Sequence, residues 1–195
     1  MTTQIFAAPD RGAASHWLKS YYFTRAGVAV VWVGAAFSLG KSSPSAAAAL
    51  LIVYPAWDAL GNFVDARRSG GLKANPSQTI NVAISTIATI TVAAALTRDL
   101  HAVMGVFGAW AVLAGLFQLI TAVRRWALGA QWAMILAGAQ SALVGAYFIK
   151  QATGSTPVGI TDIAPYAAFG ALYFLLSAVW LTVSQARRGS SQRRR

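Results

Sequence analysis

Long apolar segments alternate with short polar links along almost the whole chain. Each segment has about 17 to 23 residues, enough for one helical crossing of a ~30 Å hydrocarbon layer at 1.5 Å per residue. The pattern therefore predicts an all-α, polytopic membrane protein with six transmembrane helices. The expected helices are Phe23–Gly40, Ala46–Ala66, Thr79–Leu96, Ala102–Val123, Gln131–Ile149 and Ile163–Gln185.

The positions of the basic residues predict how these helices are oriented. Of the sixteen Lys and Arg, all but Lys41, Arg98 and Lys150 lie near the two termini or after the second and fourth segments. Basic links stay on the cytoplasmic side of a membrane. We therefore expect both termini in the cytoplasm.

Paired arginines end every second segment and indicate an internal repeat. One interpretation is that any cytoplasmic helix end attracts basic residues. Recurrence at all three equivalent ends favours instead three hairpin repeats, at about 23–68, 79–125 and 131–188, within a transmembrane domain of residues 23–188. The pairs are Arg67-Arg68, Arg124-Arg125 and Arg187-Arg188.

The residues on either side of this domain differ from it in character. Within residues 1–22, the aromatic side chains Trp17, Tyr21 and Tyr22 fall on one side of a helix. This predicts a short amphipathic helix at the membrane interface, capped by Asp10 and preceded by a disordered start. Residues 189–195 are expected to form a disordered basic tail.

Composition excludes several classes of protein. The chain is 56% hydrophobic and only 11% charged, whereas about a quarter of a soluble domain is charged. The net charge of +11 lies in short clusters beside apolar helices, which favours anionic lipids of the cytoplasmic face as partners over nucleic acid. Cysteine is absent, which excludes a thiolate metal site. No catalytic constellation is present, so we expect no enzyme activity, catalytic residue, metal or cofactor.

A polar stripe in the second segment is the best candidate for chemistry. Asp58, Asn62 and Asp65 share one helix face. An ionised Asp at a helix centre costs about 2.5 to 3.5 kcal/mol, so it usually faces a partner or water. Pro55, one turn earlier, predicts a helix kink that frees the carbonyl of Leu51.

Hairpin geometry locates a counter-charge for this stripe. If the first turn centres near Ser43, Arg25 is level with Gly61, between Asp58 and Asp65. The missing side chain at Gly61 would leave room for a guanidinium. We hypothesise an intramembrane ion pair of Arg25 with Asp58 and Asp65.

Two roles for Asp58 are open at this point. It is either one half of a structural salt bridge, or a proton- or cation-binding group in a small transporter or channel. The sequence has no second buried acid for a relay, which favours the structural role. On the outer face, His101 could sense acidity, although a lone exposed histidine in a loop is more often incidental.

Glycines recur at seven-residue spacing within three segments, which places each pair on one helix face. Such faces allow close helix contact in lipid, either within one bundle or between the protomers of a homo-oligomer. The pairs are Gly27 and Gly34, Gly108 and Gly115, and Gly138 and Gly145.

Two stretches carry a resemblance to a known family. They are Tyr54–Gly71, which includes the run Tyr-Pro-Ala-Trp-Asp, and Ala109–Arg125, which is followed by Gln131–Gly138. Over residues 23–188 the chain resembles the short-repeat family of unknown function that includes the acid-resistance membrane protein HdeD. The resemblance implies a multi-pass protein of the bacterial inner membrane with a role in acid stress. No catalytic residues come with the family.

Overall fold

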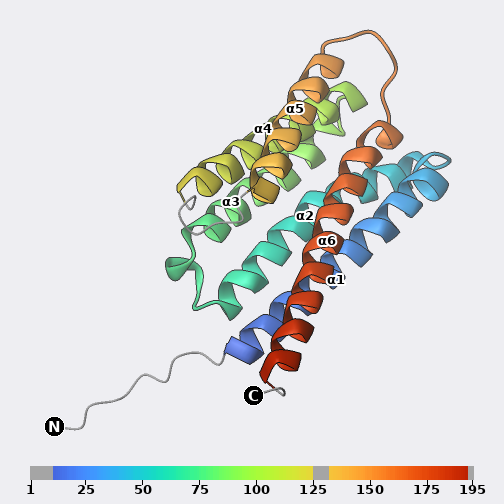
Figure 1. The fold of residues 1–195 in the computed structure, drawn as a ribbon. Coiled ribbons are helices and arrows are strands. Elements are labelled where there is room, and N and C mark those ends of the chain that lie inside the picture. The colour runs from blue at the N-terminus through green and yellow to red at the C-terminus, as the bar shows by residue number, and fades with distance from the viewer. Residues whose placement is uncertain (1–10, 125–131, 193–195) are drawn as a thin grey trace.

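The computed structural model describes residues 11–124 and 132–192, and all regular structure in these two ranges is helical. Figure 1 shows long helices that run roughly side by side. Two short elements, a π-helical turn η1 and a 3₁₀ turn η2, follow α1 and α2. The order is α1 (Arg11–Ala35), η1 (Ala36–Gly40), α2 (Pro44–Arg68), η2 (Leu72–Ala74), α3 (Pro76–Ala95), α4 (Leu100–Arg124), α5 (Trp132–Ala152) and α6 (Ile160–Gln192).

Five stretches among the described residues are long and apolar enough to cross a membrane, which confirms a helical protein of membrane character. Helix α5 is not among the stretches found within the described residues. A sixth crossing therefore remains a prediction. The five stretches are Trp17–Gly40, Pro44–Arg68, Pro76–Ala95, Leu100–Ile120 and Ile160–Arg187.

The two ends of the domain differ from the sequence-based expectation. Helix α1 is continuous from Arg11 to Ala35, so residues 11–22 do not form a separate helix. No proline interrupts the run, and Tyr22 packs on Phe174 of α6 at 5.9 Å between ring centroids. The position of these residues at the membrane interface stays a prediction. Helix α6 extends to Gln192, so most of the predicted tail is helical. The expected cap Asp10 and the disordered start, residues 1–9, lie outside the described residues.

Local sequence explains where the helices begin and turn. Ser43 caps α2 by accepting a hydrogen bond from the Ala46 amide at 3.3 Å, and Pro44 follows at the first helical position. After α2, Gly70 and Gly71 adopt φ of 99° and 93°, a region in which a Cβ atom is strained. The chain therefore reverses sharply between α2 and α3.

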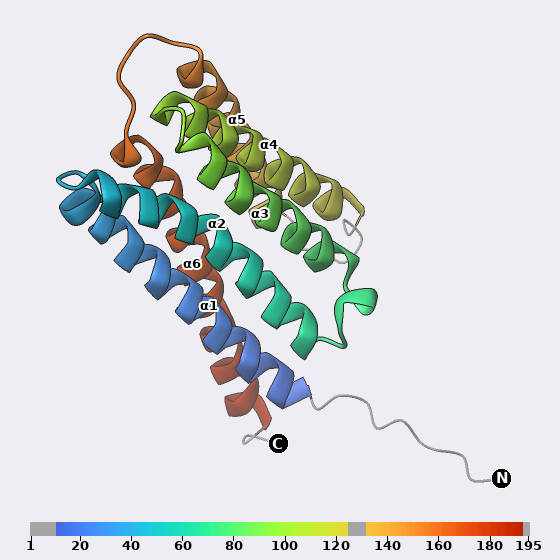
Figure 2. The ribbon, with the colours of Figure 1, turned by 180° about the vertical axis from the view of Figure 1, so that it is seen from behind.

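Close packing does not follow the predicted hairpins. The most extensive contacts join α4 with α5, α1 with α6, and α2 with α3, whereas the backbones of α5 and α6 come close at few points. Hence 131–188 is not a packed hairpin. Figures 1 and 2 show that α5 lies against α4, and that an extended link leads from it to α6 beside α1. Helix α1 begins and α6 ends at the same end of the bundle (Figure 1). The internal repeat stays a prediction.

Glycines make the contact between α4 and α5 possible. A Cβ atom at Gly108 would lie 2.7 Å from the backbone oxygen of Gly145, and one at Gly115 would lie 2.5 Å from that of Gly138. The predicted close packing is thus confirmed for these two pairs. Gly27 and Gly34 differ: nothing lies within 4 Å of an added Cβ at either position.

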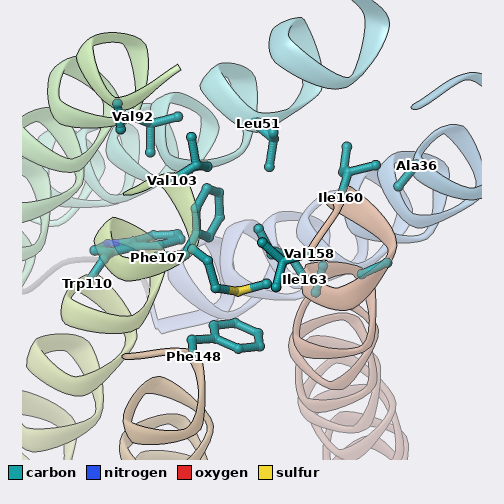
Figure 3. Packing of buried hydrophobic residues seen from close by; sticks show 14 of the residues in the cluster. Ala36, Leu51, Val92, Val103, Phe107, Trp110, Phe148, Val158, Ile160 and Ile163 are labelled. Atoms are coloured by element: carbon teal, nitrogen blue, oxygen red, sulfur yellow. The ribbon is translucent and has the colours of Figure 1, made fainter. Parts of the chain in front are cut away.

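The buried core joins the helices through aromatic rings. Tyr54 contacts Trp32, Phe107 and Trp110, with ring centroids 4.7, 6.3 and 5.8 Å away. Figure 3 shows Phe107 and Trp110 on one helix, with Leu51 and Val92 nearby. Such contacts stabilise a core beyond the area that they bury.

Large apolar side chains also cover the outside of the bundle. Val31 is 72% exposed, Leu143 72% and Trp180 75%, on three different helices. An exposed apolar surface of this kind suits contact with lipid rather than water. The described helices thus suggest a membrane protein.

Candidate functional site

Arg25 and Asp58 form the predicted ion pair between α1 and α2. Arg25 is only 7% exposed, and its Nη2 donates to Oδ1 of Asp58. Its Nη1 also donates to the backbone oxygen of Asp58 at 3.4 Å. Phe174 of α6 lies 4.7 Å from the guanidinium carbon, measured to the ring centroid. The guanidinium therefore sits between a carboxylate and an aromatic face, both of which favour a cation.

The second oxygen of Asp58 connects the pair to two more helices. Ser85 on α3 donates to Oδ2 at 2.7 Å, and Asn62 on α2 donates to the same oxygen at 3.1 Å. The indole N–H of Trp110 on α4 donates in turn to Ser85 Oγ at 3.2 Å. We call the five residues joined in this way the Asp58 network: Arg25, Asp58, Asn62, Ser85 and Trp110. It links α1, α2, α3 and α4 through hydrogen bonds.

Sequence reasoning missed Ser85 and Trp110. The hairpin geometry that paired Arg25 with Asp58 would also have found Ser85. Asp58 and Ser85 are equally far along the chain from the turn at Gly71 and Leu72, so they lie at the same level of two neighbouring helices. Trp110 has no comparable signal, since a tryptophan in an apolar helix gives no indication of its neighbour.

Asp65 does not share Arg25 with Asp58, which corrects the predicted three-residue cluster. Its Oδ2 accepts from Nε2 of Gln78 at the start of α3, at 3.2 Å. Among the residues whose side chains the structure describes, a salt bridge joins Arg25 with Asp58 and none involves Asp65. Asp65 lies two turns beyond Asp58, next to the α2–α3 connection, so the nearer amide is its partner.

The space for the Arg25 guanidinium comes from Gly61, as predicted. A Cβ atom built at Gly61 would overlap Nη1 of Arg25, and would approach Cζ at 3.2 Å and Cδ at 3.3 Å. Gly61 is buried where α1 and α2 meet. The absence of a side chain there is what lets the ion pair form.

Replacing Gly61 by Ala should lower the free energy of unfolding by about 1 to 3 kcal/mol, the usual cost of overpacking. The methyl group would push the guanidinium off Asp58. Gly27→Ala on α1 is the matched control, because its Cβ meets nothing within 4 Å. Unfolding by sodium dodecyl sulfate in mixed micelles measures both variants. Equal stability of the two would contradict the tight fit at Gly61.

Helix α2 continues through Pro55, which is buried. The indole of Trp32 on α1 donates to the backbone oxygen of Leu50 at 2.8 Å, one residue before the carbonyl of Leu51 that proline was expected to free. This second hydrogen bond between α1 and α2 therefore lies five residues before Pro55. The predicted kink itself stays a prediction.

His101 stands apart from the network. It lies in the first turn of α4, and its Nε2 is 3.0 Å from the backbone oxygen of Thr156 in the α5–α6 link. Nearby, Asp99 caps α4 by accepting from the Ala102 amide at 2.7 Å. His101 thus connects α4 to the α5–α6 link. A role of His101 in pH sensing stays a prediction.

In the described parts of the chain, no three His, Cys, Asp or Glu residues gather in a way that could hold a metal ion. The side chains that the structure does bring together can hold helices in register through charge and hydrogen bonds. No protein-family model, curated protein or solved structure matches the chain.

Proposed function

We propose that the protein is a non-enzymatic, multi-pass protein of the bacterial inner membrane, with the Asp58 network as an internal clamp between helices. The observation that carries the proposal is that both oxygens of the Asp58 carboxylate accept hydrogen bonds from the protein. Oδ1 accepts from Arg25, and Oδ2 accepts from Ser85 and Asn62. A transported cation would have to compete with these donors for the carboxylate. The residues that hold Asp58 therefore favour a structural role.

The proposed topology has six crossings with both termini in the cytoplasm. Helix α5 would be the additional crossing; it has 21 residues and packs along α4 through glycines. Its Gln140 accepts from Tyr173 of α6 at 2.5 Å, so this polar group is satisfied inside the protein. Arg67 and Arg68 at the end of α2, with Lys73 in the following turn, are the basic residues that would stay inside.

The proposed role in acid stress rests on the family resemblance over residues 23–188. Its test is survival in acid of a strain that lacks the protein, compared with the same strain carrying the wild-type gene. We expect lower survival without the protein. Equal survival would remove the acid-stress role and leave the membrane topology unaffected.

The second candidate is a proton- or cation-coupled transporter that uses Asp58. One observation favours it: the Asp58 side chain is 24% exposed, whereas that of Arg25 is 8% exposed. The carboxylate is thus less shielded than its partner. Intramembrane acids often mark ion pathways, so this reading needs a direct test.

Flux measurements in reconstituted vesicles separate the two candidates. We expect wild-type protein to give no proton or cation flux above that of empty vesicles under an imposed gradient, because both oxygens of Asp58 already accept hydrogen bonds from other helix residues. Asp58→Asn should leave this baseline unchanged. Flux by the wild-type protein that disappears in Asp58→Asn but persists in Asp65→Asn would establish the transporter instead.

A further inference from the structure

A cleft lies between α1 and α2 toward the end of the bundle where α1 begins. It has a volume of about 170 Å³, and Trp17, Tyr21, Trp57 and Val64 are among the residues that line it. A second hollow of about 430 Å³ adjoins it, because Val64 lines both. Since both hollows follow α2, we treat them as one groove and call it the α1–α2 groove.

The charge of this groove is concentrated at one end. Arg67 and Arg68 line the outer hollow and are exposed, with Cζ of Arg68 lying 4.7 Å from the Trp17 ring centroid. At the inner end, the charge of Arg25 is already balanced by Asp58. Within the described residues, neither Arg67 nor Arg68 forms a salt bridge. The groove thus combines a cationic mouth with a neutral, largely apolar interior.

The length of the groove fits one leaflet of a bilayer. From Trp57 to Arg68 α2 advances about 16 Å at 1.5 Å per residue, about half of a ~30 Å hydrocarbon layer. With the arginines at headgroup level, the inner end of the groove would lie near the centre of the membrane. An acyl chain from the same leaflet spans this depth.

Two buried donors beside the groove have no acceptor among the described residues. They are the indole N–H groups of Trp17 and Trp57, both on residues that line the cleft. Buried donors of this kind usually have a partner, so each calls for an explanation. Trp17 is near the cationic mouth, where the ester oxygens of a phospholipid would lie.

We propose that the α1–α2 groove binds one anionic glycerophospholipid. Arg67 and Arg68 hold its phosphate, and one acyl chain follows α2 past Val64 toward Trp57. The arginines complement the negative headgroup, and the apolar interior matches the chain in depth. This site goes beyond the proposed function, which requires no bound lipid.

Native mass spectrometry of the full-length protein in detergent tests the proposal, with phosphatidylglycerol and zwitterionic phosphatidylcholine as competing probes. We expect phosphatidylglycerol to be retained in preference. Arg67→Gln with Arg68→Gln should lower its retention about tenfold or more, since each arginine near an anionic surface contributes separately. The matched control is Arg98→Gln with Lys150→Gln, which removes the same charge from exposed positions in the α3–α4 link and in the last turn of α5 and should change nothing.

Val64→Trp keeps both arginines and fills the groove, so it should also abolish selective retention. It decides the question if the double arginine variant fails to fold. Three outcomes would overturn the proposal: equal retention of the two lipids, equal losses in the two double variants, or displacement of the lipid by excess inorganic phosphate. The last would indicate a site for a free anion instead of a lipid headgroup.

Discussion

Replacing Asp58 by Ala is expected to lower the free energy of unfolding by about 3 to 5 kcal/mol, the range for breaking a buried ion pair from one side. The substitution leaves the guanidinium of Arg25 buried without its carboxylate. It also removes the acceptor of Ser85 and Asn62. The loss should be measured by unfolding in mixed micelles of the intact chain.

Two further variants make this result specific to the pair. Asp65→Asn removes a similar charge from the same helix but disturbs only a contact with Gln78, so it should cost less than about 1 kcal/mol. Arg25→Leu combined with Asp58→Leu removes both charges and should recover part of the loss, because no buried charge is left alone. A double variant less stable than Asp58→Ala would argue against the pair as the source of the effect.

Replacing Gly115 by Leu is expected to separate α4 from α5 and to cost about 3 kcal/mol or more, at the upper end of overpacking effects. The first atom of the new side chain would meet backbone on the facing helix, with Gly138 O at 2.5 Å and Ala142 N at 2.6 Å. Backbone atoms cannot rotate away as a side chain can. The helices would therefore have to move apart, which unfolding in mixed micelles would report.

Gly34→Leu is the matched control for this experiment. It makes the same chemical change on α1, where an added Cβ meets nothing within 4 Å. We expect no loss of stability, since leucine is the better helix former. The same variant tests whether the Gly27 and Gly34 face joins protomers: a change in oligomeric state would show that it does. Equal destabilisation by Gly34→Leu and Gly115→Leu would contradict the α4–α5 contact.

The ion pair of Arg25 and Asp58 is a tertiary contact that could be predicted from the sequence. Two antiparallel helices joined by a short turn place their residues at known levels, so a buried charge on one indicates where its partner must be. The same reasoning wrongly assigned Asp65 as a second partner of Arg25, because the level of a residue along a helix does not say which of several polar groups is nearest. Gln78 on α3 occupies that position.

The sequence by itself determined the helical membrane character, the approximate helix positions and the Arg25–Asp58 pair. These follow from hydropathy, from helix rise per residue and from short links, all of which are local properties. Only the tertiary structure decided that α1 packs on α6 and α4 on α5, and that Ser85 and Trp110 complete the Asp58 network. In lipid, apolar surfaces attract one another without preference, so partner choice depends on the shapes of facing side chains and on glycine gaps. A hydropathy pattern does not contain that information.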